Sequence, residues 1–259
     1  MNNPIITRQQ LEIINRKTLR YPLQTAEKDY FLALVMQIIS ESPLSDKLVF
    51  KGGTAIYHCY LEQSRFSEDL DFSSNQVNLS LEEIRGMFKP VNFLAIKKDY
   101  QSGATIKIER LQYTGQLTLP NSLKVEIDRL QNVLLPPKLI KYNNMWGLDF
   151  KVRVMDVREI CAEKIRAMSD RARYRDFYDF FLLLETQTIN LDEVIMYVGR
   201  KEIRKPITKA NIIRNWKVVG TQKAAEMGQV HYSRQVDDAQ IENVIEGLPI
   251  GEITSTASG

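Results

Sequence analysis

The sequence predicts an α+β fold, with an α/β domain at residues 1–155, a helical domain at 156–250 and a mobile tail at 251–259. Three observations lead to this prediction. Residues 104–111 and 123–130 alternate apolar and polar side chains, which is typical of β-strands. From residue 156 onward, apolar residues recur at helical spacing instead. The last residues are rich in Ser, Thr and Gly, a composition expected of a mobile terminus.

The first domain is predicted to begin with two helices, over residues 8–20 and 26–41, because both segments place apolar residues at helical spacing. The apolar run 48–50 is predicted to be a short strand that ends at a glycine turn. Thr54 is then expected to be the N-cap of a helix that runs to Tyr60.

A second strand is predicted to carry Asp69 and Asp71. A helix over 80–88 is expected to begin with a capping box, because Ser80 stands three residues before Glu83. The two alternating segments described above then predict a hairpin with a long loop. After the hairpin we expect an irregular segment over 132–150, broken by prolines. A last strand is predicted over 150–155.

In the second domain, Asp156 is expected to cap a helix that runs to Ser169. A second helix is predicted from Tyr174 to Glu185. Further helices, each with an acceptable cap residue, are predicted over 191–199, 208–217 and 237–246.

The composition is that of a folded protein, since 44% of the 259 residues are hydrophobic and 26% are charged. No apolar run approaches the roughly 20 residues that cross a bilayer, and the first residues lack the apolar core of a signal peptide. We therefore expect a cytoplasmic protein with no membrane partner. Cys59 and Cys161 lack metal-ligand spacing and are predicted to be buried free thiols. With two histidines in the chain, neither a His-based triad nor a His-rich zinc site is expected.

The net charge of +3 is too small to indicate nucleic-acid binding by itself. The distribution of charge is more informative, because residues 151–175 contain eight Lys and Arg side chains and few acids. Such a segment is compatible with binding to a polyphosphate or to an RNA backbone.

Two carboxylates, Asp69 and Asp71, are the predicted metal ligands. Side chains at i and i+2 of a strand share a face, so these two stand together if Leu70 and Phe72 face the core. Carboxylates that close repel each other, and a divalent cation relieves the repulsion. Hard oxygen ligands suit Mg²⁺, with Mn²⁺ as the alternative. The third ligand is predicted to be Glu126, and the alternative is Asp128, on the same face.

Nucleotide phosphates are expected to bind at the glycine turn. Gly52 and Gly53 let the backbone approach a phosphate, and Thr54 can serve as both N-cap and phosphate contact. Arg65 and Ser67 precede the acidic pair and can reach a triphosphate from their loop, although a turn-stabilising role for the serine is an equal alternative. Glycine pairs are common, but a pair followed by two spaced carboxylates indicates a site for transferring a nucleotide.

In the helical domain, Asp176 and Asp179 lie one helical turn apart and share a face. Either of them is able to pair with Lys164 or Arg175. Spacing alone favours a structural network of ion pairs here.

Four segments together resemble the AbiEii/AbiGii family of nucleotidyltransferase-like toxins, found in type IV toxin–antitoxin and phage abortive-infection systems. They are GGTAIYHCYLEQSRFSEDLDF (52–72), LKVEI (123–127), EICAEKIRAMSDR (159–171) and RDFYDFFLL (175–183). The first also resembles the G-G…D-x-D signature of the wider DNA polymerase β-like superfamily. The resemblance implies a mixed-sheet nucleotidyltransferase core followed by a helical domain.

Position by position, the resemblance implies that Asp69 and Asp71 are the metal-binding pair and that Ser67 is the serine just before it. It also implies that Lys164 and Asp176 are active-site residues, because they match the AEK lysine and the aspartate of the R-D-x-Y-D segment. Glu126 matches the acidic position of the V-E-[IV] segment.

The sequence therefore predicts a Mg²⁺-dependent nucleotidyltransferase. We expect it to take a nucleotide from an NTP, release pyrophosphate and use an RNA acceptor such as a tRNA 3′ end, under the control of a cognate antitoxin. The alternatives are transfer to a small molecule or a protein, and a nucleotide-binding regulator without catalysis.

Overall fold

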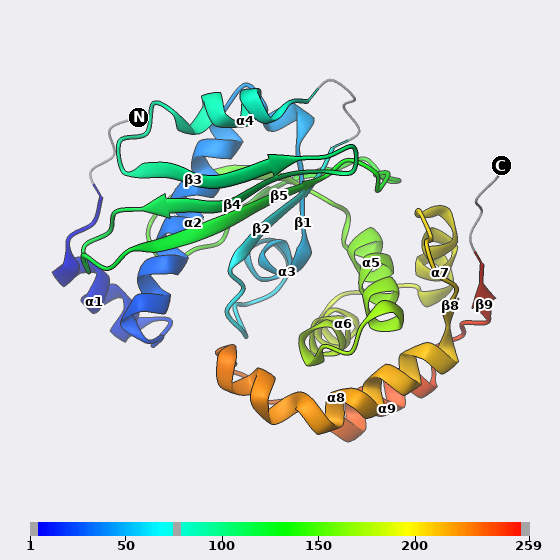
Figure 1. The fold of residues 1–259 in the computed structure, drawn as a ribbon. Coiled ribbons are helices and arrows are strands. Elements are labelled where there is room, and N and C mark those ends of the chain that lie inside the picture. Colours follow the sequence, from blue (N-terminus) through cyan, green and yellow to red (C-terminus); the bar gives the residue numbers. More distant parts are fainter. Residues whose placement is uncertain (1–4, 75–78, 255–259) are drawn as a thin grey trace. The chain divides into compact units, whose positions relative to one another are not determined.

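The structure is a computed structural model that describes residues 5–74 and 79–254. The protein has an α+β fold, as the sequence predicts, and its chain divides into two compact units (Figure 1). The first unit comprises Met1–Cys59, Ser67–Gln131 and Pro137–Val154. The second comprises Tyr60–Phe66, Asn132–Pro136 and Met155–Gly259, so two short segments from the first part of the chain belong to the helical unit.

Within the described residues, the first unit contains a seven-stranded mixed sheet with the strand order β3-β4-β5-β2-β1-β7-β6. The strands are β1 (Val49–Lys51), β2 (Asp69–Ser73), β3 (Leu94–Gln101), β4 (Thr105–Tyr113), β5 (Asn121–Asp128), β6 (Lys138–Lys141) and β7 (Lys151–Val154). Strand β2 is parallel to β5, and β1 is parallel to β7. The other neighbouring strands are antiparallel. Strand β2, which carries the acidic pair, therefore lies in the middle of the sheet.

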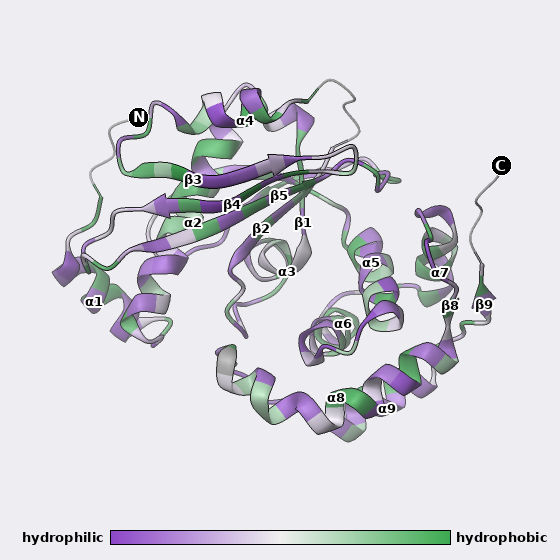
Figure 2. Ribbon diagram, in the orientation of Figure 1, coloured by the Kyte–Doolittle hydropathy of each residue, from purple (hydrophilic) through white to green (hydrophobic). Residues whose placement is uncertain are grey.

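Helices α2 (Leu23–Glu41) and α4 (Leu81–Phe88) pack on this sheet. The other helices are α1 (Arg8–Lys17), which contacts α2, and α3 (Gly52–Ala55), which contacts β1 and β2 and continues into a π-helical turn (Ile56–Tyr60); a 3₁₀ turn spans Ser45–Lys47. Helix α2 contacts β5, β7 and α4, and α4 contacts β3 (Figure 1). The sheet residues alternate accordingly: Ile106, Val125 and Ile127 are buried, whereas Lys107 and Glu126 are partly exposed. Figure 2 shows this change of hydropathy along β4 and β5.

The second unit is built from helices. They are α5 (Val157–Asp170), α6 (Tyr174–Thr186), α7 (Leu191–Arg200), α8 (Lys209–Gln229) and α9 (Asp238–Glu246), together with the two short strands β8 (Ile207–Thr208) and β9 (Glu252–Ile253). Helix α5 packs against α6, α7 and α8, and α9 packs against α6 and α8. Buried side chains such as Ile165, Phe177 and Ile212 form its core.

Several local predictions are confirmed. Strands β4 and β5 pair antiparallel, and α4 begins at Ser80 with the expected capping box to Glu83. The Asp156 side chain accepts a hydrogen bond from the Arg158 N–H at the start of α5. Both cysteines are buried free thiols.

Other predictions differ from the structure. The prediction of Thr54 as an N-cap is wrong, because α3 begins at Gly52, with Lys51 in the N-cap position. Strands β3 and β6 are not among the predicted elements, and α8 extends 12 residues beyond the predicted end at 217. The predicted mobile tail at 251–259 contains β9, which pairs with β8, and residues 255–259 lie outside the described part of the chain.

Candidate active site

The acidic pair lies on the polar face of the sheet. Leu70 and Phe72 are 0% and 1% exposed, which leaves Asp69 and Asp71 on the opposite side of β2. This is the orientation that strand alternation predicts. The two carboxylates therefore share one face of a central strand.

Strand register brings further charged residues beside the pair. In the parallel pairing of β2 with β5, Asp71 is opposite Glu126 and Asp69 is opposite Lys124. The Lys124 Nζ atom lies 2.9 Å from Glu126 Oε2 and 3.7 Å from Asp69 Oδ2. The Lys107 Nζ atom on β4 lies 3.4 Å from Glu126 Oε2. Three carboxylates and two ammonium groups thus occupy adjacent positions on this face, and Lys51 of β1, opposite Asp71, lies 3.5 Å from the Asp128 carboxylate beside them.

The electrostatics of this group centre on Asp71. Burial and repulsion from Asp69 and Glu126 raise the pKa of Asp71 to about 6, although Lys124 and Lys51 act in the opposite direction. Burial also acts to raise the pKa of Glu126, but the two neighbouring lysines hold that pKa below its usual value. In the absence of another cation, the ionised form of Asp71 is therefore disfavoured.

Gly52 is required beside the acidic pair. Its φ of +79° is strained for other residues, and a Cβ atom at this position would lie 2.6 Å from Asp71 Oδ2. The absence of a side chain lets the Asp71 carboxylate lie against the start of α3. In this way the glycine turn and the acidic pair form one local structure within the first unit.

The donor set fits a divalent cation that is shared with a substrate. Asp69 and Asp71 offer hard oxygen ligands on one face, and burial, followed by repulsion from Asp69, raises the pKa of Asp71, so that a nearby cation would favour its ionised form. Among residues 5–74 and 79–254, no group of three or more His, Cys, Asp or Glu is arranged to hold a metal ion. The structure brings Glu126 beside Asp71, but it pairs the Glu126 carboxylate with lysines.

Thr54 and Ser67 connect the glycine turn to β2. The Thr54 hydroxyl is buried and donates to the Asp69 carbonyl oxygen over 2.5 Å. Its Oγ1 atom also lies 3.0 Å from Ser67 Oγ. The Thr54 side chain, predicted as a cap and phosphate contact, therefore fastens the start of β2 to α3.

In the second unit, Lys164 lies between two aspartates. Its Nζ atom is 2.9 Å from Asp176 Oδ1 and 2.7 Å from Asp179 Oδ2, and all three side chains are buried. Burial opposes the charged form of each group, but the opposite charges outweigh it, lowering the pKa of both aspartates and raising that of Lys164. The sequence allows Lys164 to pair with Asp176 or with Asp179, and in the structure it pairs with both.

Arg65 completes this network from a distant part of the sequence. Its Nε and Nη2 atoms donate to the two carboxylate oxygens of Asp179, over 2.7 and 2.6 Å. The Arg65 side chain is 3% exposed. The sequence predicts that Arg65 reaches a triphosphate from its loop, whereas in the structure it is buried against Asp179. Asp179 is completely buried and needs cationic partners, which explains the difference. The sequence gives no signal for a pair 114 residues apart.

Backbone hydrogen bonds hold the segment that carries Arg65 in the second unit. The Phe66 N–H donates to the His231 carbonyl over 2.9 Å, and the Ser233 N–H donates to the Ser64 carbonyl over 2.8 Å. This segment leads directly into Ser67 and the acidic strand.

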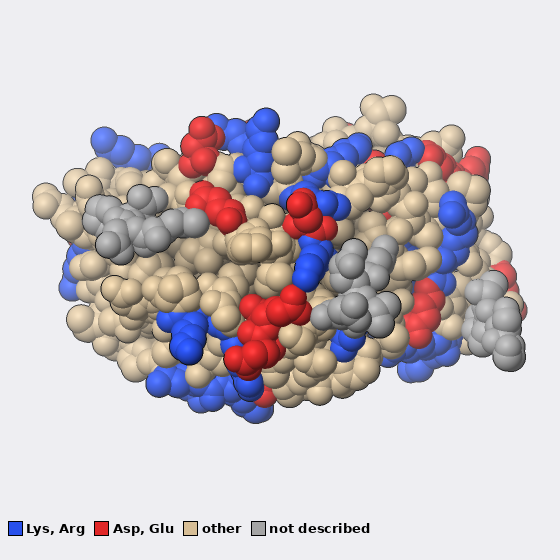
Figure 3. Space-filling model, turned by 90° about the horizontal axis from the view of Figure 1, so that it is seen from above, with Lys and Arg blue, Asp and Glu red and all other residues tan. Residues whose placement is uncertain are grey.

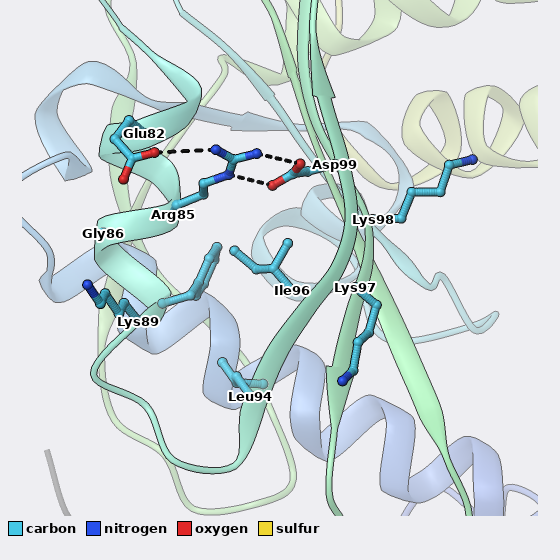
Figure 4. A pocket seen from close by; sticks show the side chains of 10 residues that line it. Glu82, Arg85, Gly86, Lys89, Leu94, Ile96, Lys97, Lys98 and Asp99 are labelled. Carbon is cyan, nitrogen blue, oxygen red and sulfur yellow. Dashed lines mark hydrogen bonds and ion pairs between the residues drawn. The ribbon is translucent and has the colours of Figure 1, made fainter.

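A pocket of about 440 Å³ lies at the edge of the sheet, between α4 and β3 (Figure 4). Arg85 is held there by Glu82 and Asp99, and Leu94 and Ile96 give the pocket apolar walls. The acidic pair of β2 is not part of its lining. The pocket therefore has no place in the chemistry described above.

The basic segment 151–175 does not form a continuous cationic surface. Arg158 pairs with Asp156 and Glu193, and Lys164 is buried among aspartates. Arg171 pairs with Asp176, its Nε atom 2.8 Å from Oδ2. It also lies near Arg173 and Arg175 where α5 meets α6, and burial, followed by repulsion from these two arginines, lowers the pKa of Arg173. On the face of the molecule in Figure 3, basic and acidic side chains are intermixed.

The comparison with protein families decides the classification. The model of the nucleotidyl transferase AbiEii toxin family, from the type IV toxin–antitoxin system, matches residues 33–239.

The chain belongs to the AbiEii family. The resemblance seen in the sequence motifs is thus confirmed, and the protein is a nucleotidyltransferase of the toxin type. The AbiEii match covers all the predicted site residues, from Gly52 to Asp176.

Solved structures agree with the AbiEii fold. MenT4, a nucleotidyltransferase toxin from Mycobacterium tuberculosis, is 20% identical, with a TM-score of 0.60 over 94% of this chain and 99% of that one. JHP933 from Helicobacter pylori is 18% identical, with a TM-score of 0.58 over 86% of this chain and 90% of that one. At these identities the likeness establishes the fold alone. The comparison with curated proteins gave no match.

Proposed function

We propose that this AbiEii-family protein is a Mg²⁺-dependent toxin that transfers a nucleotide from an NTP to an RNA, at the 3′ end of a tRNA. The observation that carries this proposal is the acidic pair, Asp69 and Asp71, side by side on β2 and directly against the glycine turn at Gly52. Mn²⁺ is the alternative cation. The fit of hard oxygen donors to a cation shared with phosphates supports this metal requirement.

The residues of the first unit have distinct proposed roles. Asp69 and Asp71 would hold the metal, with Glu126 as the candidate third ligand, and the bound metal would supply positive charge to the phosphates. Backbone N–H groups of Gly52 and Gly53, and the Ser67 hydroxyl, would contact the triphosphate. In the reaction an acceptor hydroxyl attacks the α-phosphorus, the bond to the β-phosphate oxygen breaks and pyrophosphate leaves. The proton of the hydroxyl passes to solvent.

Lys164 and Asp176 are proposed as active-site residues of the second unit, because they match the AEK and R-D-x-Y-D segments of the family. Lys164 would neutralise phosphate charge, and Asp176 would orient its ammonium, 2.9 Å away in the structure. Arg65 and Asp179 would keep this group in place. The charge of Lys164 and its pairing within the second unit support these roles.

An RNA acceptor is favoured over a small cationic molecule by the arginine cluster at Arg171, Arg173 and Arg175. A cognate antitoxin and a cytoplasmic location are proposed on the basis of the toxin–antitoxin family. None of the helices in the described part of the chain combines the length and apolar character that a membrane-spanning segment requires.

The proposal is tested by incubating the purified protein with each α-³²P-labelled NTP, Mg²⁺ and total cellular RNA. We expect label in a tRNA-sized band with the wild type and none with Asp69→Ala. Asp99→Ala is the matched control, because it changes the same residue type on β3 of the same sheet, and we expect it to retain transfer. Label that persists in Asp69→Ala would refute the role of the acidic pair. Label in protein or small molecules alone would refute the RNA acceptor.

The toxin role is tested by expressing the protein in cells. We expect growth to stop with the wild type and to continue with Asp69→Ala. Comparison of Glu126→Gln with Asp128→Asn in the transfer assay identifies the third carboxylate, and the larger loss is expected for Glu126→Gln.

A further inference from the structure

Lys124, on β5, is a cation beside two of the predicted metal ligands, Asp69 and Glu126. Its Nζ atom lies 2.9 Å from Glu126 Oε2 and 3.7 Å from Asp69 Oδ2, and its side chain is 32% exposed. These positions follow from the sheet, because Lys124 and Glu126 are i and i+2 on one strand and Asp69 is opposite Lys124 on the next. No role in nucleotide transfer is implied for Lys124 by the motifs.

The ammonium group of Lys124 supplies positive charge where the acidic residues would otherwise repel one another. Asp69, Asp71 and Glu126 lie on the same face, and Lys107 reaches Glu126 alone at 3.4 Å. Lys51, on β1 opposite Asp71, also acts on that carboxylate and pairs with Asp128 at 3.5 Å, whereas Lys124 approaches both Glu126 and Asp69. A divalent cation bound by Asp69 would bring two further positive charges close to the Lys124 ammonium, and like charges at a few ångströms repel.

We propose that Lys124 is an internal competitor of the divalent cation at this site. In the metal-free protein its ammonium neutralises Asp69 and Glu126. Binding of the cation to Asp69 requires the Lys124–Asp69 ion pair to separate, so the chain sets its own metal affinity lower than the acidic pair alone would give. This inference rests on the metal site of the proposed function.

A direct test measures Mn²⁺ binding without any turnover. Free Mn²⁺ is followed by electron paramagnetic resonance during titration of the wild type, Lys124→Gln, Lys124→Arg and Asp69→Ala. We expect Lys124→Gln to bind Mn²⁺ about tenfold more tightly, the effect of removing one nearby charge at a partly exposed position. Lys124→Arg keeps the charge and should bind like the wild type. Asp69→Ala should lose binding.

Lys98→Gln is the matched control. Lys98 lies on β3 of the same sheet and pairs with Glu109, so its replacement removes one surface charge without touching the acidic pair. We expect unchanged Mn²⁺ affinity, and a gain equal to that of Lys124→Gln would refute the inference by revealing a general charge effect.

The remaining outcomes separate this inference from the proposed function. If Asp69 is required for Mn²⁺ binding but Lys124→Gln binds equally or more weakly, the competitor role is refuted and the metal site stands. If the wild type does not bind Mn²⁺, or if Asp69→Ala binds it unchanged, the metal site of the proposed function fails and the inference fails with it. Circular dichroism of each variant establishes that it is folded before titration.

Discussion

Replacement of Asp71 by Asn should stabilise the metal-free protein at neutral pH while abolishing nucleotide transfer. The reason is the raised pKa of Asp71, about 6 in the folded protein against an ordinary value of 3.8. Between these two pH values the folded state binds more protons than the unfolded state, so the free energy of unfolding falls as the pH rises. Above the folded-state pKa the ionised carboxylate exerts its full destabilising effect, and Asn removes it.

The size of the effect follows from the shift in pKa. A rise from 3.8 to about 6 corresponds to roughly 3 kcal/mol, at about 1.4 kcal/mol for each pKa unit. Asp71 is only half-buried, and solvent reduces the effect of its neighbours to about 1–2 kcal/mol. The gain should be present at pH 7 and above, and it should vanish near pH 4, where the wild-type carboxyl is protonated in the folded protein.

Urea denaturation of both proteins, with a chelator present and at several pH values, measures this difference. Asp99→Asn is the control of opposite sign, because hydrogen bonds from Arg85 lower the pKa of Asp99 and its replacement should cost stability at neutral pH. Added Mg²⁺ should then stabilise the wild type but not Asp71→Asn. A difference that does not change with pH, or a loss of stability in Asp71→Asn at pH 7, would refute the electrostatic reasoning.

Three further predictions follow from the structure. Gly52→Ala should lower the free energy of unfolding by about 1–3 kcal/mol because of its positive φ, in addition to the cost of the contact with the β2 carboxylate, and should lower transfer. Gly86→Ala, in the open interior of α4, should instead raise the free energy of unfolding by about 0.5–1 kcal/mol. Thermal denaturation in which both variants change stability alike would contradict this. Arg65→Met should lower the free energy of unfolding by about 3–5 kcal/mol, because it leaves the buried Asp179 carboxylate with one partner fewer. The double variant with Asp179→Asn should lose less stability than the two single variants together. Additive losses in urea denaturation would argue against the pair. Lys164→Met should lose labelled transfer, and full retention of label would remove its proposed role.

Much of the fold could be predicted from local signals. Residues near in sequence determine the capping box at Ser80, the cap at Asp156 and the alternation in β4 and β5, so these predictions hold. Strand β3 carries no regular alternation of apolar and polar residues, because its register shifts near Ile96 and Lys98 and it lies at the sheet edge. The second half of helix α8 gives no helical signal in the sequence, because many of its residues are exposed and form no clear apolar stripe.

The candidate site was predictable to the extent that it depends on strand period. The shared face of Asp69 and Asp71 follows from alternation, and so does that of Lys124 and Glu126. What the sequence could not give is the register that places β5 beside β2, since that depends on which strands become neighbours. The sequence alone therefore does not predict that Lys124 approaches Asp69 or that Arg65 approaches Asp179.

The carboxylates of the two units differ in the direction of their pKa shifts, and this difference separates two kinds of role. Asp176 and Asp179 have lowered pKa values because buried cations surround them, so their charge contributes stability at neutral pH that is lost as the pH falls through the folded-state values. Asp71 has a raised pKa, so its charge is destabilising in the metal-free protein. A group that weakens the fold is best explained by a function that needs it, which favours the β2 carboxylates as the centre of the chemistry. Lys164 stabilises a network and is also proposed to meet phosphate, so its transfer and stability effects must be measured separately.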